Sequence, residues 1–342
     1  MQLGLTVTNF GNKVGANIDF LRQVEDLGFE ALWTAEAYGS DAVTPLAWIG
    51  AHLKRIKLGT SIMQVPARSP AMAAMTAATL DELSGGRFIM GIGPSGPQVS
   101  EGWHGVGYEK PLSRMREYIQ IIRAIIKREG PVKLDGEFYQ LPYKGPGSTG
   151  LGVPLKCILH PRKDMKIYVA GITPNGVRTA AELADGFFPV WTSPERFDVF
   201  KPALEEGFRR AGNGKTYGQF DMIQNVRVVV GEDVAACRDL IRPDLALVIG
   251  GMGARGKNFY NDHISKQGYE ETARKVQDLY LDGKHKEAIA AVPDALIDDI
   301  TLIGSPARIR DRAQAWKDTP VTMLNLSTSQ PEALDVMAKA FL

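Results

Sequence analysis

The sequence of 342 residues predicts an α/β fold in which residues 1–342 form a single (β/α)8 barrel of the TIM type. Two observations lead to this prediction. Eight short segments are apolar throughout, as parallel strands covered on both faces are, and nearly all are followed by a segment with helical periodicity. Eight such units without a visible domain boundary favour a closed barrel over an open doubly wound sheet.

Two insertions interrupt the alternation of strands and helices. The expected strands are residues 3–8, 31–34, 56–63, 88–92, 166–170, 186–190, 223–230 and 322–327. After the fourth strand come a β-hairpin turning at Asp135-Gly136 and a long loop rich in Pro and Gly, residues 142–164, which we interpret as a lid. Before the eighth strand lies a polar helical insertion, about residues 250–300.

Most of the expected helices start with a Ser-Pro or Thr-Pro pair. The hydroxyl side chain caps free backbone amides, and proline takes the first helical position, where its missing N–H costs nothing. The pairs are Thr44-Pro45, Ser69-Pro70, Thr173-Pro174, Ser193-Pro194 and Ser305-Pro306. The first helix is instead expected to be capped by Asn17, and others are expected at about residues 112–127 and 234–249.

Composition indicates a small-molecule ligand. The formal net charge of +1, with both signs interleaved, provides no field for nucleic acid or an anionic membrane. No segment reaches the roughly 20 apolar residues of a membrane span, and no signal sequence is recognisable. Cys157 and Cys237 form no C-x-x-C pair, and the five histidines have no metal-type spacing, so we expect a cytoplasmic protein without a bound metal.

Residues 79–105, TLDELSGGRFIMGIGPSGPQVSEGWHG, concentrate polar groups where the fourth strand ends. Barrel enzymes bind ligands at this end of their strands. The segment also matches the dinucleotide-binding pattern G-x-G-x-x-G, but Pro94 and Pro97 interrupt the helix that should follow, so we set a Rossmann site aside.

Two side chains are candidates for proton transfer. Glu36 follows the second strand and could exchange a proton or bind a ring N–H of a cofactor, or could form an ion pair at the rim. His104 lies on the loop after the fourth strand beside Glu101, Trp103 and Tyr108, where it could donate a proton or be structural.

Three further segments could hold a ligand. Small residues end the third strand at 59–63 and would let a flat ligand approach the backbone, although close packing explains them equally. The strand, turn and helix start at 168–175 could bind an anion through backbone amides near Ala170 and Gly171. Arg255 and Lys257 could hold an anionic tail or could be solvated surface charges.

Three sequence segments resemble the luciferase-like monooxygenase superfamily, in particular its branch that uses the deazaflavin coenzyme F420 and includes methylenetetrahydromethanopterin reductase. The segments are IKLGTSIM, ATLDELSGGRFIMGIG and KPLSRMREYIQIIRAI. The resemblance implies a luciferase-like (β/α)8 barrel, usually a homodimer, with the cofactor at the carboxyl ends of the strands.

The resemblance also implies roles for individual residues. A non-prolyl cis peptide, here Ser61-Ile62, would support one face of the deazaflavin ring, and Ala170, Gly171 and Ile172 would bind phosphate. Glu36 would contact the polar end of the ring. The loop along the ring edge would contribute Gly93, Ser95, Gly96, Gln98 and Val99.

One position departs from the family pattern. Relatives commonly have an acidic residue followed by His after the second strand, whereas this chain has Glu36 followed by Ala37. Either Glu36 or His104 would have to supply the proton, or no protein acid is used. We expect an F420-dependent oxidoreductase that transfers a hydride between C5 of the ring and a small organic substrate. The alternatives are an FMN-dependent monooxygenase and a binding protein without turnover.

Overall fold

A computed structural model describes residues 1–7 and 14–342. Eight parallel strands of the described chain close into a barrel, because the first pairs with both the second and the last. In order around the barrel they are β1 (Gln2–Thr6), β2 (Ala31–Thr34), β3 (Lys57–Thr60) continued by β4 (Met63–Gln64), β5 (Phe88–Gly93), β8 (Ile167–Ala170), β9 (Gly186–Phe188), β10 (Asp221–Val230) and β12 (Met323–Ser327). The predicted barrel is confirmed. Residue 8, the predicted end of the first strand, lies outside the described residues.

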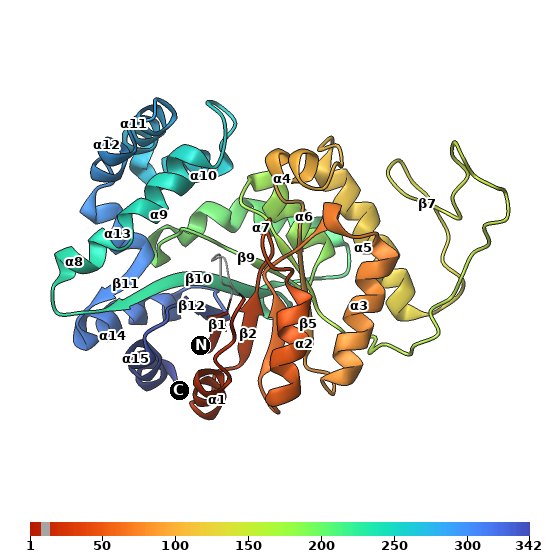
Figure 1. Ribbon diagram of the computed structural model, residues 1–342, viewed down its shortest axis with the longest axis horizontal. Helices are drawn as coiled ribbons and strands as arrows, with labels where there is room; N and C mark the ends of the chain where they lie inside the picture. The colour runs from red at the N-terminus through yellow and green to blue at the C-terminus, as the bar shows by residue number, and fades with distance from the viewer. Residues whose placement is uncertain (8–13) are drawn as a thin grey trace.

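Helices surround the barrel and pack on its outer face (Figure 1). They are α1 (Ile18–Asp26), α2 (Val43–His52), α3 (Pro70–Leu83), α5 (Pro111–Lys127), α6 (Pro174–Leu183), α7 (Lys201–Ala211), α14 (Pro306–Gln314) and α15 (Pro331–Phe341). Asn17, Ser69, Thr173 and Ser305 accept backbone N–H groups at the starts of their helices, as predicted. Such side-chain caps are typically worth about 1 kcal/mol each.

Two of the five predicted helix starts are different in the structure. At α2 the predicted cap Thr44 lies inside the helix, and the carboxylate of Asp41 accepts the amides of Val43 and Thr44 instead. A carboxylate at a helix N-terminus also interacts favourably with the helix dipole. Ser193-Pro194 begins a 3-10 helix, Pro194–Phe200, without a side-chain cap, and α7 follows it.

The barrel lumen is filled by an aromatic cluster. The indole of Trp33 packs edge-on against Phe188, with ring centroids 5.3 Å apart, and also contacts Tyr168. Gly59 makes room for it, because a Cβ at that position would lie 2.2 Å from the Trp33 ring. This cluster forms a packed floor below the carboxyl ends of the strands.

The insertion before the last barrel strand is larger than predicted. It contains α8 (Val234–Asp239), α9 (Arg242–Ala246), α10 (Phe259–Ile264), α11 (Glu270–Leu281), α12 (His285–Ala290) and α13 (Asp294–Ile300), which share an apolar cluster of their own. The single helix predicted over 234–249 is wrong, since a second helix begins at Arg242 with Pro243 in its first turn. The sequence analysis also missed a strand, β11 (Thr301–Gly304), which pairs in parallel with the end of β10.

The predicted hairpin is confirmed as β6 (Leu134–Asp135) paired with β7 (Gln140–Leu141). The carboxylate of Glu117 accepts the amides of residues 137–139 and so fixes the turn. The loop that follows, residues 142–164, projects past α3 and α5 on the outside of the barrel (Figure 1), and Arg162 ties it to Asp81 of α3. A lid would lie over the carboxyl ends of the strands, whereas this loop lies on the outside of the barrel. Among the described residues, no helix is both long and apolar enough to traverse a bilayer.

Candidate active site

The structure brings the segments after four barrel strands together at one rim. The predicted cis peptide between Ser61 and Ile62 is present, between β3 and β4. A Cβ added to Gly93 at the end of β5 would lie 3.0 Å from Cδ1 of Ile62 and 3.3 Å from Cβ of Ala170. Ile62, Gly93 and Ala170 therefore form one apolar surface above the aromatic floor, which we call the bed.

The neighbouring strands approach each other closely beneath the bed. The hydroxyl of Thr60 donates to the carbonyl of Gly91 at 2.8 Å and accepts the Gly91 amide at 2.9 Å. A Cβ at Gly91 would lie only 1.8 Å from the carbonyl oxygen of Thr60. Glycine is required there because the two backbones leave no room for a side chain.

The loop after β8 has the form of an anion site. The Thr173 hydroxyl accepts the Gly176 amide at 3.1 Å and starts α6. A Cβ at Gly171 would lie 2.7 Å from the backbone of Gly176, so glycine allows the turn to fold against the helix start. The start of a helix favours an anion, and Ala170, Gly171 and Ile172 directly precede this helix start.

A hydrogen-bonded group of side chains lines one side of the bed. The Oε1 atom of Gln64 lies 2.7 Å from Nε2 of His104, and the side-chain amide of Gln64 donates to the Ser95 hydroxyl at 3.2 Å. The Tyr108 hydroxyl donates to the Ser95 carbonyl at 2.8 Å. Ser95 has a φ of 62°, a left-handed conformation that is uncommon for serine. Gln98 and Val99 lie not in a loop, as predicted, but in a short helix, α4 (Pro97–Gly102), which Gly96 precedes.

Glu36 is engaged on both carboxylate oxygens. It forms an ion pair with Arg68 through both guanidinium NH groups and accepts the amides of Gln64 at 2.7 Å and Ala42 at 3.0 Å. Its side chain is 6% exposed. Burial alone would lower the pKa of Arg68, but the hydrogen bond and charge of Glu36 outweigh it and raise that pKa. This arrangement corresponds to the rim ion pair rather than to a free acid.

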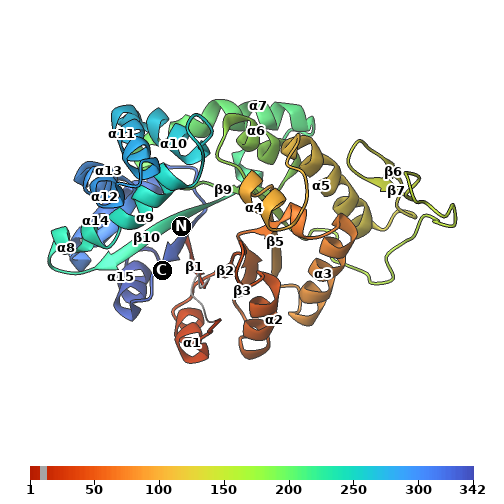
Figure 2. The same ribbon diagram turned by 45° about the horizontal axis from the view of Figure 1, so that its top comes forward.

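The insertion before the last barrel strand forms a second side of the candidate site. Figure 2 shows α4 and α10 above the same end of the barrel. Burial raises the pKa of Tyr108, and the neighbouring Tyr260 of α10 adds to the effect. Burial likewise raises the pKa of Tyr260. Both phenols therefore stay protonated at neutral pH and can serve as hydrogen-bond donors between the insertion and the loop after β5.

Two residues of the insertion, His263 and Gln267, form hydrogen bonds with the loop after β9. The Nε2 atom of His263 lies 3.0 Å from the carbonyl of Val190 and 2.9 Å from the hydroxyl of Thr192. Gln267 donates to the carbonyl of Trp191 at 2.6 Å. The sequence analysis missed Gln64, Tyr260, His263 and Gln267. Of these, only Gln64 had a signal, since it directly follows the small residues that end the third strand.

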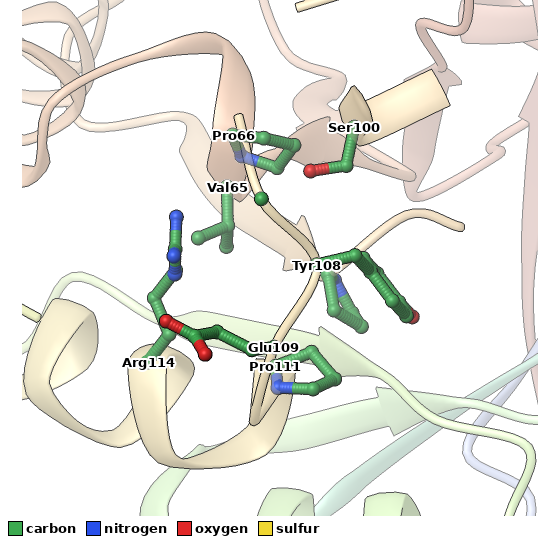
Figure 3. Close-up of a pocket in the computed structure, with 9 residues that line it drawn as sticks. Val65, Pro66, Ser100, Tyr108, Glu109, Pro111 and Arg114 are labelled. Carbon is green, nitrogen blue, oxygen red and sulfur yellow. The ribbon is translucent and has the colours of Figure 1, made fainter. Parts of the chain in front are cut away.

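Arg255 was predicted either to hold a ligand tail or to be a surface charge. It forms ion pairs with Asp278 and Asp282 of α11, and Lys257 lies exposed beside it. A narrow hollow lies next to the His104 loop, with Ser100, Tyr108, Glu109 and Arg114 in its wall (Figure 3). No cluster of three metal-ligating side chains occurs among the residues the structure describes.

Comparison with known proteins agrees with this architecture. The sequence model of the luciferase-like monooxygenase family matches residues 1–323. A Mycobacterium tuberculosis protein, provisionally named as a coenzyme F420-dependent oxidoreductase, is 42% identical over 340 residues, covering 99% of this chain and 98% of the relative. A 5,10-methylenetetrahydromethanopterin reductase of Archaeoglobus fulgidus is 27% identical over 306 residues, covering 89% and 87%.

Solved structures share the fold. The F420-dependent tetrahydromethanopterin reductase of Methanopyrus kandleri superposes with a TM-score of 0.78 at 21% identity, covering 99% of this chain and 97% of that one. At this identity the likeness concerns the fold alone. It places the bed and the His104 group at the carboxyl end of a barrel that other proteins share.

Proposed function

The chain belongs to the luciferase-like monooxygenase family, and from this premise we propose that it is an oxidoreductase dependent on coenzyme F420. The enzyme transfers a hydride between C5 of the deazaflavin and a small organic substrate. The observation that carries the proposal is the bed, in which the Ile62 side chain, Gly93 and Ala170 lie against one another and offer a flat heterocycle one apolar surface. The named relatives support F420 as that heterocycle.

The residues around the bed fit this cofactor. Ser61 and Ile62 would contact one face of the ring, and Gly93, Ser95, Gly96, Gln98 and Val99 would line its edge. Ala170, Gly171 and Ile172 would hold the phosphate at the start of α6. When bound, F420 supplies a carbon that accepts or donates a hydride, so the protein has to orient the reactants and exclude water.

His104 is our proposed proton-transfer residue. It compensates for Ala37, which stands where relatives commonly have histidine. Its Nε2 is held by Gln64, and its ring is only partly buried, so a substrate could reach it. Glu36 acts as a positioning residue, since its carboxylate fixes the Gln64 backbone and pairs with Arg68.

A titration of the apoprotein with F420 and with FMN tests the cofactor assignment. We expect F420 to bind at least tenfold more tightly, and hydride transfer to some acceptor in a substrate screen. Tighter binding of FMN would make the protein a flavin-dependent monooxygenase instead. Tight F420 binding with no transfer to any acceptor would support the binding protein without turnover.

A variant of the bed tests where the ring binds. Gly93→Val should weaken F420 binding by about tenfold or more, because the added methyl groups would meet Ile62 and Ala170. Gly130→Val is the matched control, since a Cβ there would meet nothing within 4 Å. Equal F420 affinity of Gly93→Val and the parent protein would remove the bed from the cofactor site.

The proposed assembly is a homodimer. Large apolar side chains stand exposed on α2 and α3, which lie side by side: Trp48 is 60% exposed, Met72 and Met75 are 52% exposed, and Leu83 is 77% exposed. Residues 142–164 next to them expose several more. Apolar side chains exposed on neighbouring helices are typical of an interface, and a two-fold axis would let the same surface of two copies cover itself.

A further inference from the structure

The side chain of Gln64 lies between His104 and Ser95. Its Oε1 atom is 2.7 Å from Nε2 of His104, and its Nε2 atom donates to the hydroxyl oxygen of Ser95 at 3.2 Å. The glutamine is 4% exposed. Ile62 packs in the lumen cluster and Met63 in the outer core, so the alternation of an extended chain directs Gln64 toward the lumen side.

This arrangement determines which imidazole nitrogen carries the proton. The amide nitrogen of Gln64 has only hydrogens to offer, and it uses one toward Ser95. The amide oxygen, which faces His104, can only accept. With the Gln64 amide in this orientation, the Nε2 atom of His104 donates, and a neutral imidazole with hydrogen on Nε2 has its lone pair on Nδ1.

We propose that Gln64 is the positioning residue that holds neutral His104 in the tautomer protonated on Nε2. Nδ1 is then the ring nitrogen that can accept a proton. No hydrogen bond to Nδ1 occurs within residues 1–7 and 14–342. The catalytic consequence rests on the proposed function, whereas the tautomer itself is a property of the apoprotein.

The backbone of Gln64 is itself held in place by the ion pair of Glu36 and Arg68. Its backbone amide donates to Glu36 at 2.7 Å, and Arg68 pairs with the same carboxylate. The imidazole is thus held through a buried ion pair and the end of a barrel strand rather than through the loop alone. Side chains of strands position a reacting group more accurately than a loop does.

The proton step balances in both directions. With F420 bound, a substrate that is oxidised would give up its hydride, together with the bonding electron pair, to the cofactor, and the proton of its O–H or N–H would pass to Nδ1 of His104. The resulting imidazolium carries hydrogen on both nitrogens and keeps the bond to Gln64. In reduction the imidazolium returns that proton. The titratable or charged groups on the elements around the His104 loop include Glu101, Tyr108, Tyr260 and the pair of Glu36 and Arg68. Glu109 and Arg114 line the hollow next to this loop.

Nitrogen NMR of apoprotein labelled with ¹⁵N-histidine tests the tautomer without any cofactor. The His104 resonances are assigned by their loss in His104→Gln. We expect the parent protein at pH 8 to show a protonated Nε2 and an unprotonated Nδ1, and Gln64→Met to show a mixture of tautomers. Gln64→Glu keeps an acceptor oxygen and should restore the single tautomer. Protonation of Nδ1 in the parent protein, or the same spectrum in Gln64→Met, would overturn the inference.

Kinetics test the consequence. Gln64→Met should lower kcat by about tenfold with F420 affinity unchanged within twofold, and it should flatten the pH dependence of kcat. Gln224→Met is the control, because Gln224 is equally buried on β10 but faces away from the lumen. A fall in F420 affinity equal to the fall in kcat would contradict the positioning role. If F420 does not bind but the tautomer is as expected, the proposed function fails and the inference about Gln64 stands.

Discussion

Glu36 illustrates how the surroundings of one residue select between two chemical roles. A carboxylate at the mouth of a barrel can exchange protons if one oxygen is free. Both oxygens of Glu36 are engaged, by Arg68 and by two backbone amides. Charge-assisted bonds of this kind fix the position of the carboxylate. The residue therefore stabilises the loop that carries Gln64.

Removal of the Glu36 charge should lower the free energy of unfolding more than it affects kcat. Glu36→Gln leaves the guanidinium of Arg68, 17% exposed, without its counter-ion, and breaking a buried pair costs about 3 kcal/mol. The free energy of unfolding from urea titration measures this loss. Glu36→Gln combined with Arg68→Met should recover part of it. Unchanged stability together with a large fall in kcat would instead assign Glu36 to proton transfer.

For single residues, the sequence predicted which positions lie at the site better than it predicted their hydrogen-bond partners. The residues Ser61 and Ile62 followed from a family motif, and the cis peptide lies between them. His104 followed from its place after the fourth strand. Gln64 was not predicted, because its contact with His104 joins residues 40 apart and depends on the path of both loops. Local sequence patterns cannot predict a contact between two side chains so far apart in the chain.

Among the elements, the insertion acts on the barrel through His263. Its imidazole stacks on Phe200, with ring centroids 5.4 Å apart, and binds the loop after β9. Burial lowers the pKa of His263 to about 4, which keeps the ring neutral at pH 7. A neutral ring can satisfy the Val190 carbonyl without placing a charge in an apolar contact.

This burial predicts a loss of stability in mild acid. The folded pKa of about 4 lies below the ordinary 6.5 of histidine, so the unfolded chain binds more protons between these values. The contribution is complete above pH 6.5 and falls by about 3 kcal/mol as the pH drops toward 4. His263→Gln should show a smaller decrease in Tm between pH 7 and pH 4.5 than the parent protein. An equal decrease in both proteins would show that other groups dominate.

Strand prediction was reliable where length and periodicity agreed. The strands of the barrel were found because each is an apolar run and nearly all precede a segment with helical periodicity. The additional strand β11 was missed, because its four residues lie between α13 and Ser305 and could as well extend either helix. Short apolar runs cannot be assigned by periodicity alone, and pairing with β10 decides this one.

At the scale of the whole molecule, the order of strands and helices was enough to predict closure. Parallel strands need helical crossovers, and eight such units exhaust the chain in one ring. The direction of the long loop could not be predicted. Residues 142–164 were read as a lid, yet they project past α3 and α5 on the outside of the barrel (Figure 1). There Arg162 pairs with Asp81, and the Leu155 carbonyl accepts the Val132 amide. Such contacts between distant segments decide on which side of a barrel a loop packs.

The apolar surface on α2 and α3 predicts the behaviour of the protein in solution. Light scattering after size exclusion should give twice the 37.3 kDa of one chain. Met72→Glu combined with Met75→Glu should shift the protein toward the monomer, because two charges would be buried in each copy of the interface. Leu240→Glu is the control, since Leu240 is 63% exposed on the insertion, away from α3. A monomeric parent protein, or dissociation caused equally by the control, would exclude the α2 and α3 surface as the interface.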